Sequence, residues 1–154
     1  MDDDEAMHRA LALAASVRAL TSPNPWVGSV VLTADGERFE GATAAPGGPH
    51  AEASALAKAG TSAAGATLYT TLEPCSHRGR TPPCADAIVA AGIARVVVGI
   101  RDPDPQVAEQ SYVHDEPGTP EPGSSWTSDC SATGSRVSWR PTSSIVAPGG
   151  RGWC

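Results

Sequence analysis

Two short stretches of this 154-residue chain, residues 49–52 and 71–84, constrain its fold most, because together they hold the side chains of a metal site. They supply one imidazole from His50, two thiols from Cys75 and Cys84, and one carboxylate from Glu52. An imidazole and two thiolates are three protein ligands for zinc, and they leave a fourth position for water, as in catalytic sites. The sequence therefore predicts a zinc site (Zn2+) at His50, Cys75 and Cys84, with Glu52 beside it as a carboxylate that is not a ligand.

Other interpretations of the two cysteines stay open from their positions alone. Cys75 and Cys84 could form a disulfide or be inert core thiols, although a chain without an export signal favours metal ligands. A purely structural zinc would normally need four protein ligands, and His77 is the residue that would supply the fourth. A structural zinc site does not require a carboxylate that is not a ligand, so the presence of Glu52 favours the catalytic interpretation.

The hydrophobic pattern predicts an α/β fold with helices on the faces of a sheet. Ala34-Asp35-Gly36 is a hairpin-turn signal between two strands, and the apolar run 94–100 is typical of a buried strand. A helix capped by Asp3 or Asp4 is expected to continue to Leu20. The further expected elements are strands over 27–33, 38–43, 67–71 and 94–100, a helix from His50 to near Gly60, and a helix from Pro82-Pro83 to Gly92. Cys75 then follows a strand, and Cys84 lies in the first turn of a helix, which favours its thiolate.

Charge and composition narrow the classes of partner. The formal net charge is -6, and Lys58 is the only lysine, so the basic excess that a long nucleic acid requires is missing. No run of about 18 apolar residues is present that could span a bilayer, so we expect no membrane partner. Residues 1–5 have neither the positive nor the apolar part of a signal peptide, so we expect a cytoplasmic protein.

The predicted site has a definite chemistry. Zinc makes a water molecule a nucleophile at neutral pH, and Glu52 would carry its proton to a ring nitrogen and then to a departing amine. Zinc-dependent base deaminases combine H-x-E with P-C-x-x-C, and their Glu is not a ligand. Here the first half matches, but the second cysteine comes nine positions after the first instead of three. An aminopyrimidine or purine that loses ammonia is the expected substrate class.

The motifs resemble the deaminase domain of the bifunctional riboflavin-biosynthesis deaminase/reductase, in the cytidine-deaminase-like superfamily. They are SPNPWVG (22–28), GGPHAE (47–52), TLEPCSHRGRTPPC (71–84), AGIARV (91–96) and DPDP (102–105). The resemblance runs from about Met7 to Ala108, and the widened cysteine spacing is its most specific feature. It implies a three-layer α/β/α fold.

The resemblance also implies an activity and a set of substrate contacts. The implied reaction is the hydrolytic deamination of 2,5-diamino-6-(5-phosphoribosylamino)pyrimidin-4-one, a small phosphoribosylated pyrimidine, to 5-amino-6-(5-phosphoribosylamino)uracil. Asn24 would hydrogen-bond the pyrimidine or the ribose, while His77 and Arg80 would bind the phosphate. Deaminases of this type usually associate, so a homo-oligomer is a further expectation. A general nucleoside or base deaminase and an inactive zinc-stabilised remnant are the alternatives.

The chain departs from this family in two places. The family commonly has a histidine where this chain has Thr43, so the resemblance does not carry that substrate contact over. Residues 111–154 are rich in Ser, Thr, Pro and Gly without a hydrophobic period, which predicts a low-complexity, disordered tail. We interpret this tail as an out-of-frame read of a GC-rich coding sequence. Residues 1–110 would then be a deaminase domain without its C-terminal part, and the reductase domain would be absent.

Overall fold

The computed structural model of the chain describes residues 1–76, 82–100 and 102, and the backbone of residues 143–146. Its helices are α1 (Asp3–Val17), α2 (Ala51–Ala59) and α3 (Cys84–Ala90), and a 3-10 turn, η1 (Gly60–Ala63), follows α2. Its strands are β1 (Gly28–Leu32), β2 (Arg38–Ala42), β3 (Thr67–Leu72), β4 (Arg95–Ile100) and β5 (Ser143–Val146). In this described part, no helix combines the length and the apolar character needed to cross a bilayer.

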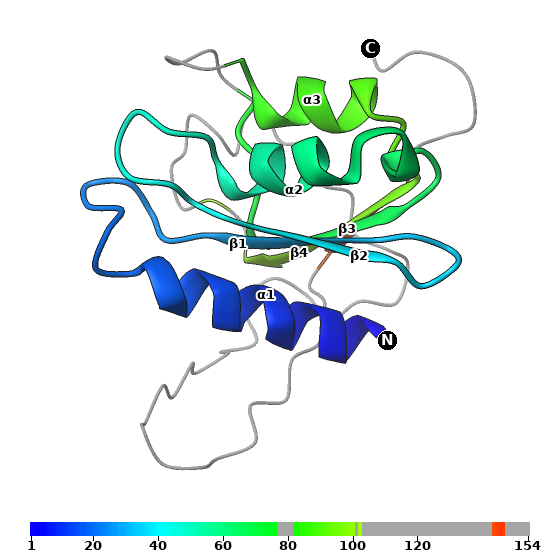
Figure 1. Cartoon of the computed structure of the whole chain (residues 1–154), viewed down its shortest axis with the longest axis horizontal. Coiled ribbons are helices and arrows are strands. Elements are labelled where there is room, and N and C mark those ends of the chain that lie inside the picture. Colours follow the sequence, from blue (N-terminus) through cyan, green and yellow to red (C-terminus); the bar gives the residue numbers. More distant parts are fainter. Residues whose placement is uncertain (77–81, 101, 103–142, 147–154) are drawn as a thin grey trace.

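The strands form one mixed sheet in the order β2-β1-β3-β4-β5. β1 is antiparallel to both β2 and β3, β3 is parallel to β4, and β5 is antiparallel to β4. Helix α1 covers one face of the sheet, and α2 and α3 cover the other (Figure 1). The predicted three-layer α/β/α architecture is therefore confirmed.

Two hydrophobic cores fill the space between the layers. The alternation of side chains along each strand divides the apolar residues of the sheet between the two faces. The core under α2 and α3 includes Val31, Leu68, Val96 and Val98. The core under α1 includes Val30, Tyr69 and Val97. The continuous apolar run of β4 is thus explained, because this strand packs against helices on both faces.

Helix α1 begins and ends differently from the sequence expectation. Its cap is Asp2 rather than Asp3 or Asp4: the Asp2 side chain accepts a hydrogen bond from the Glu5 N–H, and the Glu5 side chain accepts one from the Asp2 N–H. This reciprocal capping box requires an acidic residue three positions after the cap, and Glu5 meets that requirement only for Asp2. The helix ends at Val17, three residues before Leu20.

Strand β5 lies within the segment that the sequence pattern assigned to a disordered tail. Its backbone pairs with β4 from Arg95 to Val98 and completes the sheet on that side. The sequence offered no period in this segment, but a four-residue strand needs only a free strand edge to pair with. The remainder of 111–154 lies outside the described residues.

Gly41 sets how closely α2 approaches the sheet. A Cβ atom at this position would lie 2.1 Å from the Ala51 carbonyl oxygen and 2.6 Å from the Ala55 nitrogen. Gly41→Ala should therefore push α2 away from β2 and lower the free energy of unfolding by about 1–3 kcal/mol, the usual cost of overpacking. Because His50 and Glu52 lie at the start of α2, zinc retention should fall as well. Urea unfolding and metal analysis test this, and unchanged values for both would contradict it.

Asp3 ties the start of α1 to the sheet. Its carboxylate accepts hydrogen bonds from the Tyr69 hydroxyl at 2.7 Å and from Arg95 Nη1 and Nη2 at 2.9 and 2.7 Å. The Arg95 hydrogen bonds lower the pKa of Asp3, against an opposing effect of burial. A carboxyl group whose pKa is lowered by folding stabilises the protein above its unfolded pKa and loses that contribution as the pH falls through the folded pKa.

Asp3→Asn should lower the free energy of unfolding at pH 7 by about 1 kcal/mol, because the ion pair is partly exposed to solvent. The difference from wild type should begin to shrink below about pH 4, the ordinary pKa of an aspartate, and disappear once the pH falls below the lowered pKa of folded Asp3. Urea unfolding at pH 7 and pH 3 measures both values. Asp4→Asn is the matched control, since it removes a charge from the same helical turn without touching Arg95. A difference of equal size at both pH values would contradict the prediction.

Candidate metal centre

Three metal-ligating side chains from three parts of the chain meet at one end of the sheet. His50 precedes α2, Cys75 follows β3 by three residues, and Cys84 is the first residue of α3. His50 Nδ1 lies 3.7 Å from Cys75 Sγ and 3.3 Å from Cys84 Sγ. All three ligand atoms lie within 4.8 Å of one another. This end is also where β3 and β4 finish, the usual place for a site in an α/β sheet.

The local backbone aims each ligand at the shared point. His50 is the N-cap residue of α2 with φ -69° and ψ 163°, and within this described helix start its side chain makes no capping hydrogen bond. The sequence predicted His50 in the first turn of this helix, but the helix begins one residue later, at Ala51. An extended residue followed directly by a helix lets His50 and Glu52 face the same side, which their spacing on a regular helix would not. The imidazole remains available to the two sulfur atoms.

The two cysteines are held together through the start of α3. The Ala85 N–H donates to the Cys75 carbonyl oxygen at 3.2 Å, and the Cys84 N–H donates to Cys75 Sγ at 3.3 Å. Pro83 precedes Cys84 with an extended ψ of 138°, which begins the helix at Cys84. Both cysteines are free thiols, so the disulfide interpretation is wrong.

The spacing of the three atoms fits a tetrahedral zinc ion. Bonds of about 2.3 Å to sulfur and about 2.0 Å to nitrogen at tetrahedral angles would separate the ligand atoms by roughly 3.5 Å. The two nitrogen-to-sulfur distances, 3.7 and 3.3 Å, lie on either side of this value. Two thiols and one imidazole also bind zinc in preference to calcium or magnesium, which favour oxygen ligands.

The pKa values of the Cys75 and Cys84 thiols shift in opposite directions. Hydrogen bonds from the Cys84 side chain and backbone lower the pKa of Cys75, and the charge of His50 acts in the same direction. The pKa of Cys84 is raised, chiefly because its thiol donates to Cys75 and because it is buried. The surroundings of Cys75 thus favour its thiolate form, and a bound cation would favour the thiolate of both cysteines.

Glu52 lies in the wall of the same cluster. It is 4% exposed, and its carboxyl group interacts electrostatically with Cys75, His50 and Cys84. Burial raises the pKa of Glu52 to about 7, with the charge of Cys75 contributing in the same direction. A carboxyl group with a pKa near neutrality is suited to accept and return a proton. A second buried glutamate, Glu73, occupies a different place: its Oε2 accepts from the Asp102 N–H at 3.2 Å, which ties the end of β4 to the cysteine loop.

Of the three predicted substrate contacts, Asn24, His77 and Arg80, the structure describes only Asn24. Asn24 is exposed in the loop between α1 and β1, and its N–H donates to the Thr21 carbonyl oxygen at 2.7 Å. His77 and Arg80 lie outside the described residues. Thr43, which stands where the family commonly has a histidine, is buried and directs its hydroxyl to the backbone of Val27.

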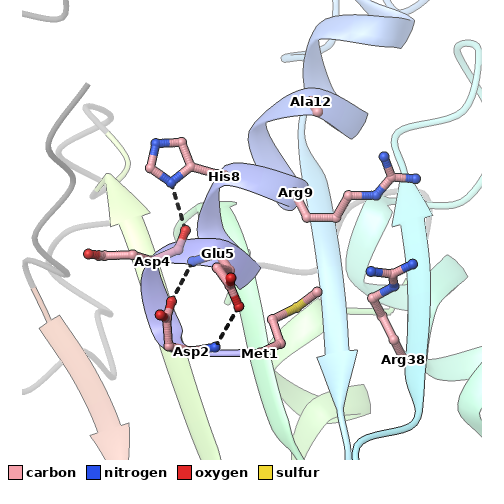
Figure 2. A pocket seen from close by; sticks show the side chains of 8 residues that line it. All are labelled: Met1, Asp2, Asp4, Glu5, His8, Arg9, Ala12 and Arg38. Carbon is pink, nitrogen blue, oxygen red and sulfur yellow. Dashed lines mark hydrogen bonds between the residues drawn. The ribbon is translucent and has the colours of Figure 1, made fainter. Parts of the chain in front are cut away.

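A hollow of about 600 Å³ lies on the solvent side of α1 (Figure 2) and is separate from this cluster. Charged side chains of both signs surround it, with two hydrogen bonds of the capping box at its edge (Figure 2). Neither the three metal-ligating residues nor Glu52 lines this hollow. The lining residues are Met1, Asp2, Asp4, Glu5, His8, Arg9, Ala12 and Arg38.

The sequence pattern does not predict the contacts of three buried polar residues in the segments next to the cluster. Glu73 was noted only as part of a motif, and the hydroxyls of Thr43 and Thr71 gave no signal. Their partners lie 29, 16 and 43 positions away in the chain. Contacts between such distant residues leave no local pattern in a single sequence.

Comparison with known proteins places the chain among zinc-binding deaminases. The family described as "Cytidine and deoxycytidylate deaminase zinc-binding region" matches residues 1–100. The "Riboflavin biosynthesis protein RibD" of Escherichia coli is 58% identical over 109 residues, which cover 70% of this chain and 29% of the relative. The chain thus spans under a third of the length of the curated relatives that it resembles.

Solved structures agree with this placement. RibD of Acinetobacter baumannii, form 1, superposes with a TM-score of 0.66 at 48% identity, covering 70% of this chain and 30% of that one. A diaminohydroxyphosphoribosylaminopyrimidine deaminase/5-amino-6-(5-phosphoribosylamino)uracil reductase from Thermotoga maritima gives a TM-score of 0.61 at 46% identity, covering 66% and 30%. Since the family match includes His50, Glu52, Cys75 and Cys84, the chain belongs to the family of the cytidine and deoxycytidylate deaminase zinc-binding region.

Proposed function

We propose that this chain is a zinc-dependent deaminase that converts 2,5-diamino-6-(5-phosphoribosylamino)pyrimidin-4-one to 5-amino-6-(5-phosphoribosylamino)uracil in riboflavin biosynthesis. The observation that carries this proposal is the cluster of His50, Cys75 and Cys84 with Glu52 buried against it. The choice of substrate is supported by relatives at 46–58% identity whose names contain this deaminase or riboflavin biosynthesis.

His50, Cys75 and Cys84 would hold the zinc ion. When bound, zinc supplies an activated water molecule at neutral pH. Three protein ligands suit this role, since a structural zinc usually has four. His77, the alternative fourth ligand, lies outside the described residues. That water rather than His77 occupies the fourth coordination position of the zinc is therefore part of the proposal.

Glu52 would move the protons of the reaction. The oxygen of a water molecule adds to the ring carbon that carries the amino group, and Glu52 passes the water's proton to the neighbouring ring nitrogen. Glu52 then takes the second proton of the former water and gives it to the amine, the carbon–nitrogen bond breaks, and ammonia leaves. The new carbon–oxygen bond becomes the carbonyl of the uracil. Burial of Glu52 keeps solvent from competing for these protons.

The substrate contacts are carried over from the family resemblance. Asn24 would hydrogen-bond the pyrimidine or the ribose, and His77 and Arg80 would bind the phosphate. An arginine next to a helix start is a favourable anion site, and Arg80 precedes α3 by four residues. Thr43 is left out of these contacts, because its hydroxyl is already engaged by Val27.

Ammonia release by the full chain tests the proposal. The zinc-loaded protein should release ammonia from the diaminopyrimidinone phosphate and much less from cytidine or deoxycytidylate. Comparable rates on the nucleosides would favour the general deaminase instead. Stoichiometric zinc without ammonia release from any of these compounds would reject an enzymatic role and leave an inactive, zinc-stabilised remnant.

A further inference from the structure

Two buried threonine hydroxyls hold consecutive residues at the entrance to β1. The Thr43 hydroxyl accepts from the Val27 N–H at 3.1 Å and donates to the Val27 carbonyl oxygen at 3.3 Å. The Thr71 hydroxyl accepts from the Gly28 N–H at 3.2 Å. Thr43 is 6% exposed and Thr71 is 8% exposed, so these bonds are shielded from water. Without them, two buried backbone donors would lose their partners.

The held residues lie between the two arms that carry the metal ligands. On one side, the Thr43 N–H donates to the Val27 carbonyl at 2.9 Å, and the Ala44 N–H donates to the Pro49 carbonyl at 3.1 Å. This connects Val27 to the residue directly before His50. On the other side, Thr71 belongs to β3, four positions before Cys75. The position of Val27 and Gly28 is therefore fixed relative to both His50 and Cys75.

The loop 22–26 enters the sheet through these two residues. The described backbone hydrogen bond of this loop runs from the Asn24 N–H to the carbonyl oxygen of Thr21, the residue before the loop, and does not reach the sheet. The first firm connections to β2 and β3 are those of Val27 and Gly28. Displacement of these two residues would therefore move Asn24 relative to the candidate metal centre.

We propose that Thr43 and Thr71 are positioning residues: by holding Val27 and Gly28, they fix the end of the loop 22–26 relative to the segments that carry His50 and Cys75, and so set the binding of the substrate without touching it. This inference rests on the proposed function, in which Asn24 contacts the substrate. It also assigns a role to Thr43 where the family resemblance gave none. The hydroxyl groups, rather than the methyl groups, carry the role.

Removal of each hydroxyl tests the proposal in the full chain. Thr43→Val and Thr71→Val should each raise KM for the diaminopyrimidinone phosphate about tenfold, with kcat and zinc content changed less than about threefold. Thr43→Ser and Thr71→Ser should restore KM, because they restore the hydroxyl. Thr70→Val is the matched control: Thr70 is fully buried on the same strand, but its hydroxyl donates to the Leu72 carbonyl within β3.

Amide hydrogen exchange at Val27 and Gly28 is a second test of the proposal, and it requires no substrate. Exchange at Val27 should accelerate in Thr43→Val, and exchange at Gly28 should accelerate in Thr71→Val, whereas Thr70→Val should leave both unchanged. Unchanged exchange in the first two variants, or the same rise in KM in Thr70→Val, would overturn the inference. A wild-type protein without deaminase activity would reject the proposed function, and the exchange result alone would then decide whether the two hydroxyls hold the loop.

Discussion

Glu52→Gln is expected to lower kcat for ammonia release by about 10²–10⁴-fold while the protein keeps its zinc. The amide has nearly the shape of the carboxylate, so the packing of the buried side chain should survive. It cannot accept a proton and return it, and the proposed reaction requires two such transfers. Because Glu52 is assigned no metal bond, zinc content measured on the same sample should equal that of wild type.

Glu73→Gln is the matched control for this prediction. Glu73 is also a buried glutamate, 5% exposed against 4% for Glu52, and lies two residues from Cys75. Its carboxylate accepts a hydrogen bond from the Asp102 N–H, which the amide oxygen of glutamine can also accept. Because Glu73 has no part in the proposed proton transfers, Glu73→Gln should retain most of its activity. Equal losses in the two variants would indicate a general effect of lost charge, and loss of zinc from Glu52→Gln would make Glu52 a ligand.

Cys84→Ser is expected to weaken zinc binding by more than about 100-fold, the upper end of the effect of losing a residue that only supports a ligand. Cys84 Sγ lies 3.3 Å from His50 Nδ1, and its backbone N–H donates to Cys75 Sγ. A serine hydroxyl keeps the backbone arrangement but is a poor ligand for zinc at neutral pH. Activity should fall with the metal.

The response of thermal stability to zinc measures the same effect. For wild type, zinc at 100 times its Kd should stabilise the folded state by about 2.7 kcal/mol, and at the same concentration Cys84→Ser should show almost none of this gain. Cys130→Ser is the control, since Cys130 belongs to the segment 111–154 and is not one of the three proposed zinc ligands. A zinc-dependent rise in Tm that survives in Cys84→Ser would contradict the assignment of Cys84 as a ligand.

The elements of the fold were predictable because their signals are local. The β-branched runs of β3 and β4, the Asp-Gly turn before β2 and the proline pair before α3 each act within a few residues. That His50, Cys75 and Cys84 lie close together was also predictable, because few side chains bind zinc and their spacing in the chain is distinctive. Element ends were less predictable, as the cap at Asp2 shows, since neighbouring acidic residues offer nearly equivalent caps.

The sequence by itself determined which groups can do chemistry: an imidazole, two thiols and a carboxylate, on segments whose helical and extended preferences are encoded locally. Only the tertiary structure decided that Glu52 is buried against the cysteines, and that Thr43 and Thr71 turn their hydroxyls to Val27 and Gly28. The physical reason is distance along the chain. A helix cap or a turn is chosen by neighbours three or four residues away, whereas a buried hydrogen bond between residues 16 or 43 positions apart exists only after strand pairing brings them together.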